Sequence, residues 1–290
     1  MKKEFITYAQ DLEDWILFCA LNDVQNGFYV DVGANDPCFC SVTKAFYDMG
    51  WNGINIEPLK QEYDKLCLER PRDINLNIGA GAENASLEFL IGGGGTTCDP
   101  ETVRGFSDNN SIKKEMIPVR RLSDVLNEHL KGENKTIHFL KIDVEGFERS
   151  VLEGMDFNKY RAWIIVIEAT LPGTFIPCHD KWEDILLKNN YEVGFTYGIN
   201  RYYVDKLLDR KRNKKINSGF AGFWIKIFTN KIEQKFFPEK YSHIKKLRQL
   251  KSYMHGYTQY RNNLLSIIFR GIITMYRGIK AAIKFLIRKP

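Results

Sequence analysis

Short apolar runs alternate with amphipathic segments along the first 205 residues of the chain. The runs have the length of strands, whereas the segments between them repeat apolar residues at helical spacing, as Val42, Ala45, Phe46 and Met49 do. The pattern predicts strands over residues 28–32, 53–57, 74–78, 137–143, 163–168, 191–197 and 201–204, and helices over 8–21, 41–49, 60–69, 122–130, 147–154 and 182–188. This alternation predicts an α/β fold with a doubly wound, mostly parallel sheet.

The segment between the third and fourth of these strands is less regular. Residues 87–91 form an apolar run that predicts an extra strand, and residues 118–121 are expected to be extended. Gly92 to Gly95 are four consecutive glycines, which give the backbone its greatest freedom. They predict a mobile lip over the site, with no strand.

Charge divides the chain into two parts. Residues 1–205 contain 21 Lys and Arg against 33 Asp and Glu, a balance of −12, whereas residues 206–290 contain 21 against 3, a balance of +18. We therefore predict an α/β domain over 1–205 and a basic, helical extension over 206–290.

The end of this extension predicts a basic amphipathic helix over residues 264–290. Its cations fall on one arc of about 80° on a helical projection, with apolar residues on the neighbouring and opposite arcs. These cations are Arg270, Arg277, Lys280, Lys284 and Arg288. No uncharged run within 264–290 exceeds six residues, which is short of the roughly 20 that a membrane span needs. An anionic membrane surface is the expected partner, packing on the domain or on a second subunit is the alternative, and nucleic acid is not expected.

The first strand ends in the most informative motif of the chain. Asp31 is followed by a turn of Gly33, Ala34 and Asn35, where an α/β sheet holds its ligand. A dinucleotide fingerprint would need two further glycines, but Asn35 and Cys38 stand at those positions. A carboxylate before a single-glycine turn suits a ligand with an amino group and a cationic centre. S-adenosylmethionine is such a ligand.

Two later strand ends extend this predicted cofactor site. Glu57, followed by Pro58, lies 26 residues after Asp31 and can accept both hydroxyls of a ribose. Ile78 and Gly79 close the third strand, where backbone amides can meet the edge of an adenine. We expect the strand-end carboxylates to face solvent.

Acids also end the fourth and fifth strands. Asp31, Glu57, Asp143 and Glu168 at four successive strand ends imply a cationic or polyhydroxylated ligand. Asp143, Glu145, Glu168 and His179 are the candidates for removing a proton from an acceptor hydroxyl. Alternatively, Asp143, Glu168 and His179 hold a divalent cation that acidifies this hydroxyl. The sequence leaves both mechanisms open.

Six separated blocks of the sequence resemble the FkbM-type S-adenosylmethionine-dependent methyltransferases. They lie at residues 8–11, 27–37, 45–58, 139–148, 167–179 and 200–203, and the resemblance covers roughly 5–205. It implies a class I methyltransferase (Rossmann-like) fold and O-methylation, often of a surface glycan or a small metabolite. The chain departs from the family pattern at Cys38-Phe39-Cys40 and at Gly92–Gly95, both near the expected acceptor pocket. These departures bear on the identity of the acceptor, for which the family's frequent setting in surface-glycan synthesis implies a sugar or glycan intermediate.

Two other functions fit parts of the sequence. A nucleotide-binding oxidoreductase shares the architecture but needs the missing glycines, and a non-catalytic membrane-associated scaffold would not need the strand-end acids. Acids at 11, 13 and 14 interrupt any N-terminal apolar run, and the six cysteines lack disulfide or zinc spacing. We therefore expect a cytoplasmic protein, peripheral at the inner face of the membrane if the extension binds lipid. The sequence makes no prediction of oligomeric state.

Overall fold

The computed structural model describes residues 5–92, 95–99, 112–130 and 135–236, with side chains to Phe223. The chain divides into two compact units, Met1–Lys226 and Ile227–Pro290, and the first contains a seven-stranded sheet. Its strands, in spatial order, are β10 (Tyr191–Tyr197), β11 (Asn200–Asp205), β9 (Ala162–Glu168), β8 (Ile137–Ile142), β1 (Phe28–Val32), β2 (Asn52–Ile56) and β3 (Ile74–Leu76). β11 runs antiparallel to its neighbours, while the strands from β9 to β3 are parallel. The predicted α/β fold with a mostly parallel sheet is confirmed.

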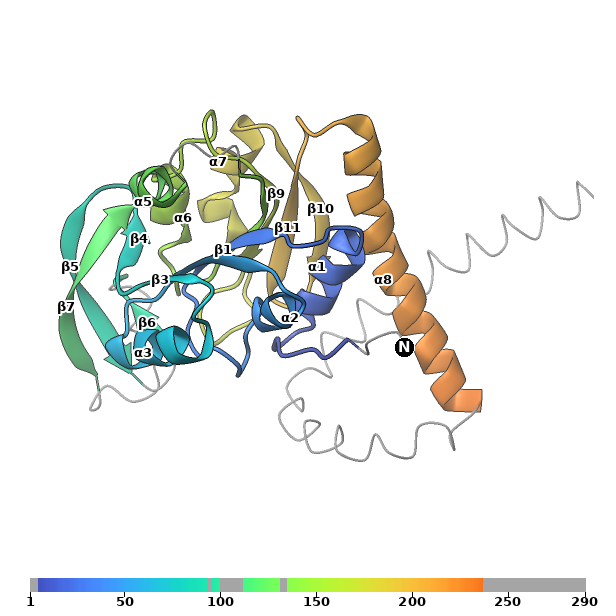
Figure 1. Ribbon diagram of the computed structural model, residues 1–290, viewed down its shortest axis with the longest axis horizontal. Coiled ribbons are helices and arrows are strands. Elements are labelled where there is room, and N and C mark those ends of the chain that lie inside the picture. Colours follow the sequence, from blue (N-terminus) through green and yellow to red (C-terminus); the bar gives the residue numbers. More distant parts are fainter. Residues whose placement is uncertain (1–4, 93–94, 100–111, 131–134, 237–290) are drawn as a thin grey trace, which may run out of the picture. The chain divides into compact units, whose positions relative to one another are not determined.

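Helices cover both sides of this sheet (Figure 1). One side carries α1 (Glu13–Leu21), α2 (Lys44–Asp48) and α3 (Lys60–Glu69), and the other carries α5 (Leu122–His129), α6 (Glu148–Glu153) and α7 (Glu183–Lys188). Successive residues of a strand point to opposite sides. Accordingly, Val30 and Ile142 pack in the core beneath α5–α7, whereas Tyr29 and Phe139 stack at 5.6 Å on the α1–α3 side.

A second sheet lies between β3 and α5 in the sequence. It contains β4 (Gly79–Gly81), β7 (Lys113–Arg121), β5 (Ala85–Gly92) and β6 (Gly95–Thr97), in that order, and packs around Phe89, Ile117 and Val119. The prediction of no strand beside the glycine run was wrong, because β6 pairs with the end of β5. The third strand of the main sheet ends at Leu76, so Gly79 belongs to the smaller sheet.

The basic extension begins with α8 (Arg210–Phe236), which follows β11. Within the first unit, Ile216, Phe220 and Phe223 of this helix are buried, and the ring of Phe220 stacks on Phe195 of β10 at 5.3 Å. The start of the extension is thus packed on the α/β domain. Among the helices that the structure describes, none combines the length and the hydropathy needed to cross a bilayer. The helix predicted over 264–290 lies outside the described residues.

Candidate active site

The carboxyl ends of β1 and β8 meet where the winding of the chain reverses. β2 and β3 extend the sheet from one side of β1, and β8 and β9 extend it from the other. Ligands of open α/β sheets bind in the crevice at such a point. The turns after β1, β2, β8 and β9 therefore define the candidate active site.

A buried ion pair underlies the turn after β1. Asp31 and Lys141 both point to the α1–α3 side, where Lys141 Nζ lies 3.3 Å from Asp31 Oδ1 and donates to the Gly33 carbonyl at 2.5 Å. Thr43 Oγ1 donates to Asp31 Oδ2 at 2.9 Å. Burial alone would lower the pKa of Lys141, but Asp31 and Asp143 raise it above its usual range. Asp31 is 1% exposed, so the expectation that it faces solvent was wrong.

The turn after β1 requires glycine at one position. Gly33 has φ +78°, and a Cβ there would lie 1.9 Å from the backbone oxygen of Asp143. The amides of Gly33 and Ala34 donate to the Ile56 carbonyl at 3.0 and 3.2 Å. Asn35 also has a positive φ, +52°. Such strained residues persist where the surrounding structure fixes them, and they cluster at functional sites.

Glu57 joins the turns after β1 and β2. Its two carboxylate oxygens accept from the amides of Asn35 at 2.7 Å and Leu59 at 2.8 Å. Burial raises the pKa of Glu57 to about 7, although these two amides oppose the shift. Glu57 is only 4% exposed, which also contradicts the expectation of a solvated carboxylate. Each oxygen can still accept a second hydrogen bond.

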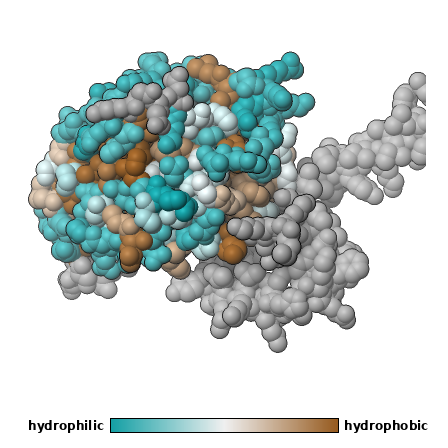
Figure 2. Space-filling model, viewed as in Figure 1, coloured by the Kyte–Doolittle hydropathy of each residue, from teal (hydrophilic) through white to brown (hydrophobic). Residues whose placement is uncertain are grey.

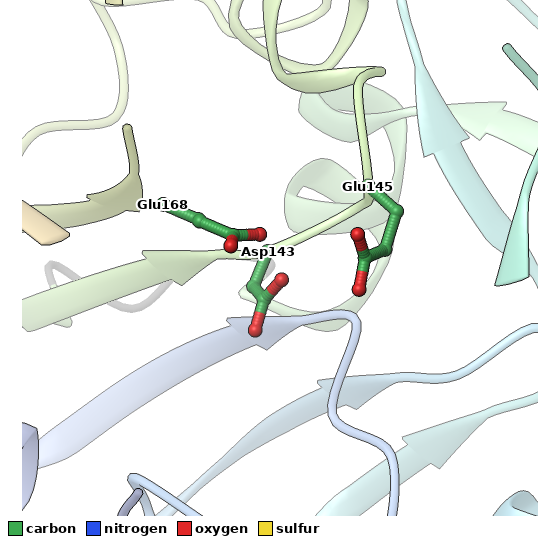
Figure 3. A group of neighbouring side chains, drawn as sticks. All are labelled: Asp143, Glu145 and Glu168. Atoms are coloured by element: carbon green, nitrogen blue, oxygen red, sulfur yellow. The ribbon is translucent and has the colours of Figure 1, made fainter. Parts of the chain in front are cut away.

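Three carboxylates gather after β8 and β9. Oxygens of Asp143, Glu145 and Glu168 lie within 4.8 Å of one another, and Figure 3 shows the three side chains converging from the turn after β8 and the end of β9. Burial and the neighbouring Asp143 and Glu145 raise the pKa of Glu168 to about 10. Burial and Asp143 raise that of Glu145 to about 8. Mutual repulsion in a partly desolvated site therefore keeps protons on this acid cluster at neutral pH.

Residues outside the predicted set hold the turn after β8. Thr97 Oγ1 of β6 donates to the Glu145 carbonyl at 2.7 Å, so the small sheet reaches the acid cluster. Glu148 Oε1 accepts from the amides of Val144 at 3.4 Å and Gly146 at 3.1 Å. Glu148 could have been suspected as an acid in the first turn of a helix. No sequence signal pointed to Thr97.

The remaining predicted residues lie apart from the acid cluster. His179 is half-buried in the short helix η2 (His179–Lys181) and is not a member of the cluster. Gly79 of β4 pairs with Val119, and Pro58 accepts from Asn77 Nδ2 through its carbonyl at 2.9 Å. Ile78 is partly buried against the main core. Figure 2 shows apolar residues gathered among hydrophilic ones on the face seen in Figure 1, in the region of β3 and β4.

A cavity of about 340 Å³ lies away from this site. Its lining includes Phe18 and Leu21 of α1 and Val24, which lie in the segment that leads into β1. It also includes Trp51, which directly precedes β2. The cavity is therefore at the amino edge of the sheet. None of its lining residues is an acid or a base. The carboxyl edge, where such groups converge, is the better candidate for catalysis.

The site can accommodate two kinds of group. Carboxylate oxygens such as those of the acid cluster are the ligands that Mg²⁺ and Ca²⁺ prefer, so this cluster could hold a divalent cation. The glycine turn and Glu57 offer a close backbone approach and a hydroxyl acceptor, which fit the ribose and amino acid parts of S-adenosylmethionine.

The chain was compared with protein-family models, curated proteins and solved structures. Residues 31–193 match the family model described as Methyltransferase FkbM domain. The crystal structure of methyltransferase FkbM from Methylobacillus flagellatus KT is 18% identical, with a TM-score of 0.40 over 62% of this chain and 43% of that one. The yhhF protein of Escherichia coli is 12% identical, with a TM-score of 0.35 over 70% of this chain and 91% of that one. None of the curated proteins compared with the chain matches it.

Proposed function

Because the chain belongs to the methyltransferase FkbM domain family, we propose that it transfers a methyl group from S-adenosylmethionine to a hydroxyl of a sugar or glycan intermediate. The observation that carries this proposal is the acid cluster beside the glycine turn, at the reversal point of the sheet. A carboxylate-rich site suits an acceptor with several hydroxyls. An oxidoreductase is less well supported, because the turn keeps only one of the three glycines of a dinucleotide site.

The cofactor would be held by the turns after β1, β2 and β3. The Gly33–Asn35 turn would provide the close backbone approach, Glu57 would accept ribose hydroxyls, and Ile78 and Gly79 would contribute the contacts to the adenine. Asp31 contributes indirectly, since its pairing with Lys141 fixes the turn from below. When bound, S-adenosylmethionine supplies an electrophilic methyl group on a positively charged sulfur.

Asp143 is our candidate for the group that receives the hydroxyl proton. Its side chain is 42% exposed, so it can reach an acceptor, and Lys141 Nζ lies 3.5 Å from Asp143 Oδ2. Glu145 and Glu168, which hold protons at neutral pH, are suited to donating hydrogen bonds to acceptor oxygens. His179 as the base, and a cation held by the acid cluster, are the two other routes that the chemistry allows.

Titration calorimetry with S-adenosylmethionine tests the cofactor site. Glu57→Gln keeps the shape of the side chain but weakens a charge-assisted contact worth about 1.5–3 kcal/mol, so we expect the Kd to rise at least about tenfold. Glu69→Gln, an exposed position at the end of α3, is the matched control and should bind normally. Unchanged affinity in a folded Glu57→Gln variant would remove Glu57 from the site.

Turnover measurements then separate the three catalytic routes. Asp143→Asn should abolish transfer while it leaves the Kd for S-adenosylmethionine within about twofold, because the base acts on the acceptor. Loss of turnover in His179→Ala instead would identify the histidine as the base. Inhibition by chelator with recovery on adding Mg²⁺ would assign the acid cluster to a cation.

We also propose that the basic extension brings the protein to an anionic membrane surface. Exposed cations of α8, namely Arg210, Lys211 and Lys214, continue the positive charge of the tail into the first unit. Each Lys or Arg near an anionic bilayer contributes about 1 kcal/mol. The full chain should pellet with phosphatidylglycerol vesicles at low salt, and a chain ending at Lys226, which retains the buried residues of α8, should not. Equal pelleting of the two chains would contradict the proposal.

A further inference from the structure

Two loops flank the acid cluster, and each exposes large apolar side chains. The loop of residues 36–41 follows β1 and carries Phe39, which is 78% exposed. The loop of residues 170–178 follows β9 and carries Phe175 and Ile176, which are 48% and 58% exposed. β8 lies between β1 and β9 in the sheet, so these loops lie on the two sides of the turn that carries Asp143.

Both loops come close to the acid cluster. Partial burial raises the pKa of the Cys40 thiol, next to Phe39, and the carboxylates of Glu13, Asp36 and Asp143 raise it further, so this loop lies within electrostatic reach of Asp143. Cys178, at the end of the other loop, is likewise within reach of Glu168. Both loops are therefore part of the rim of the candidate active site.

Hydrogen bonds with the side chains of Asp36 and Arg70 fix the backbone of the loop that carries Phe39. Asp36 Oδ1 accepts from the amides of Cys38 at 2.9 Å and Phe39 at 2.8 Å. Arg70, which is completely buried, donates to Ser41 Oγ at 2.7 Å and to the Pro37 carbonyl. Phe39 is therefore a large apolar side chain that an anchored loop holds largely in water.

The second loop is also ordered by its own hydrogen bonds. Thr170 and Pro177 form an isolated antiparallel bridge, and the Leu171 amide donates to the Ile176 carbonyl at 2.8 Å. The Cys178 amide returns to the Ala169 carbonyl at 2.9 Å, directly after β9. Phe175 and Ile176 are thus held at the tip of a hairpin-like loop rather than on a random segment.

We infer that Phe39 and Phe175 are the acceptor-specificity residues and provide apolar platforms for the ring of the sugar. This inference rests on the proposed function and adds the residues that select the acceptor. A pyranose has polar edges and apolar C–H faces, so apolar walls beside a centre of carboxyl groups complement both. Insertion of these loops into a membrane is the competing explanation. It is disfavoured because Asp36 and Asp143 beside them would meet the anionic surface unfavourably.

Kinetics on a fixed panel of acceptors test the inference. The panel contains free hexoses, N-acetylhexosamines and nucleoside-diphosphate hexoses, with tritium-labelled S-adenosylmethionine as the donor. For the best acceptor, Phe39→Ala should raise KM about tenfold, since aromatic contacts are worth up to about 1.5 kcal/mol, and should change kcat less. Phe39→Tyr should restore KM, and Phe175→Ala should act in the same direction as Phe39→Ala. Leu68→Ala, at an equally exposed residue of α3, is the matched control and should be neutral.

Each other result has a distinct meaning. A wild-type KM in both Phe→Ala variants overturns the inference, as does a loss of binding to phosphatidylglycerol vesicles with KM unchanged. An equal loss of affinity for S-adenosylmethionine would place Phe39 in the cofactor site instead. Wild-type protein that binds S-adenosylmethionine but methylates no member of the panel overturns the sugar acceptor alone. Failure to bind S-adenosylmethionine would reject the proposed function itself.

Discussion

The two sides of the main sheet are buried to a similar extent, but at the carboxyl ends of β1 and β8 they carry different chemistry. Beneath α5–α7, Val32 and Ile142 are 1% and 0% exposed and pack in one continuous apolar core. Neighbouring residues of the same strands, Asp31 and Lys141, are 1% and 8% exposed on the α1–α3 side. Burial of apolar area stabilises the fold, whereas buried charges are costly unless they are paired. Apolar packing holds the fold on both sides, including Tyr29 and Phe139 on the α1–α3 side, whereas the paired charges that underlie the site are on the α1–α3 side alone at these strand ends.

Substitutions at two adjacent residues of β8 should show the largest difference in the free energy of unfolding, because the two side chains point to opposite sides of the sheet. Lys141→Met leaves Asp31 as a buried charge without its cation, which should lower the free energy of unfolding by about 3–5 kcal/mol. Ile142→Val removes one methylene from the apolar side and should cost about 0.5–1.5 kcal/mol. Urea denaturation of the two variants measures both values. A smaller cost for Lys141→Met than for Ile142→Val would show that the Lys141–Asp31 pair does not stabilise the fold.

The glycine turn should show the second-largest effect. Gly33→Ala combines a positive φ with a clash against the Asp143 carbonyl, so we expect a cost of about 3 kcal/mol or more and loss of cofactor binding. Gly173→Ala is the control for φ alone, because Gly173 has φ +67° and open space around it, and should cost about 1 kcal/mol. Denaturation and calorimetry on the two variants separate strain from collision. An equal loss of unfolding free energy in the two variants would mean that the backbone near Gly33 shifts to make room for the added Cβ.

Much of the main sheet could be predicted because its signals are local. The strand over 28–32 and the helix over 60–69 have the predicted bounds, since apolar runs, helical periodicity and Pro71 act within a few residues. The small sheet was recognised only in part, as the strand at 87–91 and the extended residues 118–121. Its remaining strands depend on pairing partners far along the chain, such as Val119 of β7 for Gly79 of β4. Pairing at that distance leaves no periodic signal in a short segment.

The candidate site was predicted as a set of residue types rather than as a geometry. Strand ends indicated Asp31, Glu57, Asp143 and Glu168, but not that Asp31 would be enclosed by Lys141 and Thr43. The side to which a strand residue points follows from alternation, yet its burial depends on the helix that covers it. For this reason the expected solvent exposure was wrong for the two cofactor carboxylates, and the contact of Thr97 with the acid cluster was missed.

The pH dependence of stability should show the smallest effect, and it tests the acid cluster directly. The pKa of Glu168 is raised from 4.5 to about 10, so above about pH 4.5 the unfolded chain releases a proton that the folded chain keeps. Stability should then fall as the pH rises from 6 to 8, with a contribution from this group of at most about 1.4 kcal/mol per pH unit.

Glu168→Gln cannot ionise and should flatten the slope, although Glu145, with a pKa of about 8, retains part of it. Glu192→Gln, an exposed acid on β10, should leave the slope as in the wild type. Identical slopes in all three proteins would mean that Glu168 is ionised in the fold, and that the acid cluster holds its charges by another means, such as a bound cation.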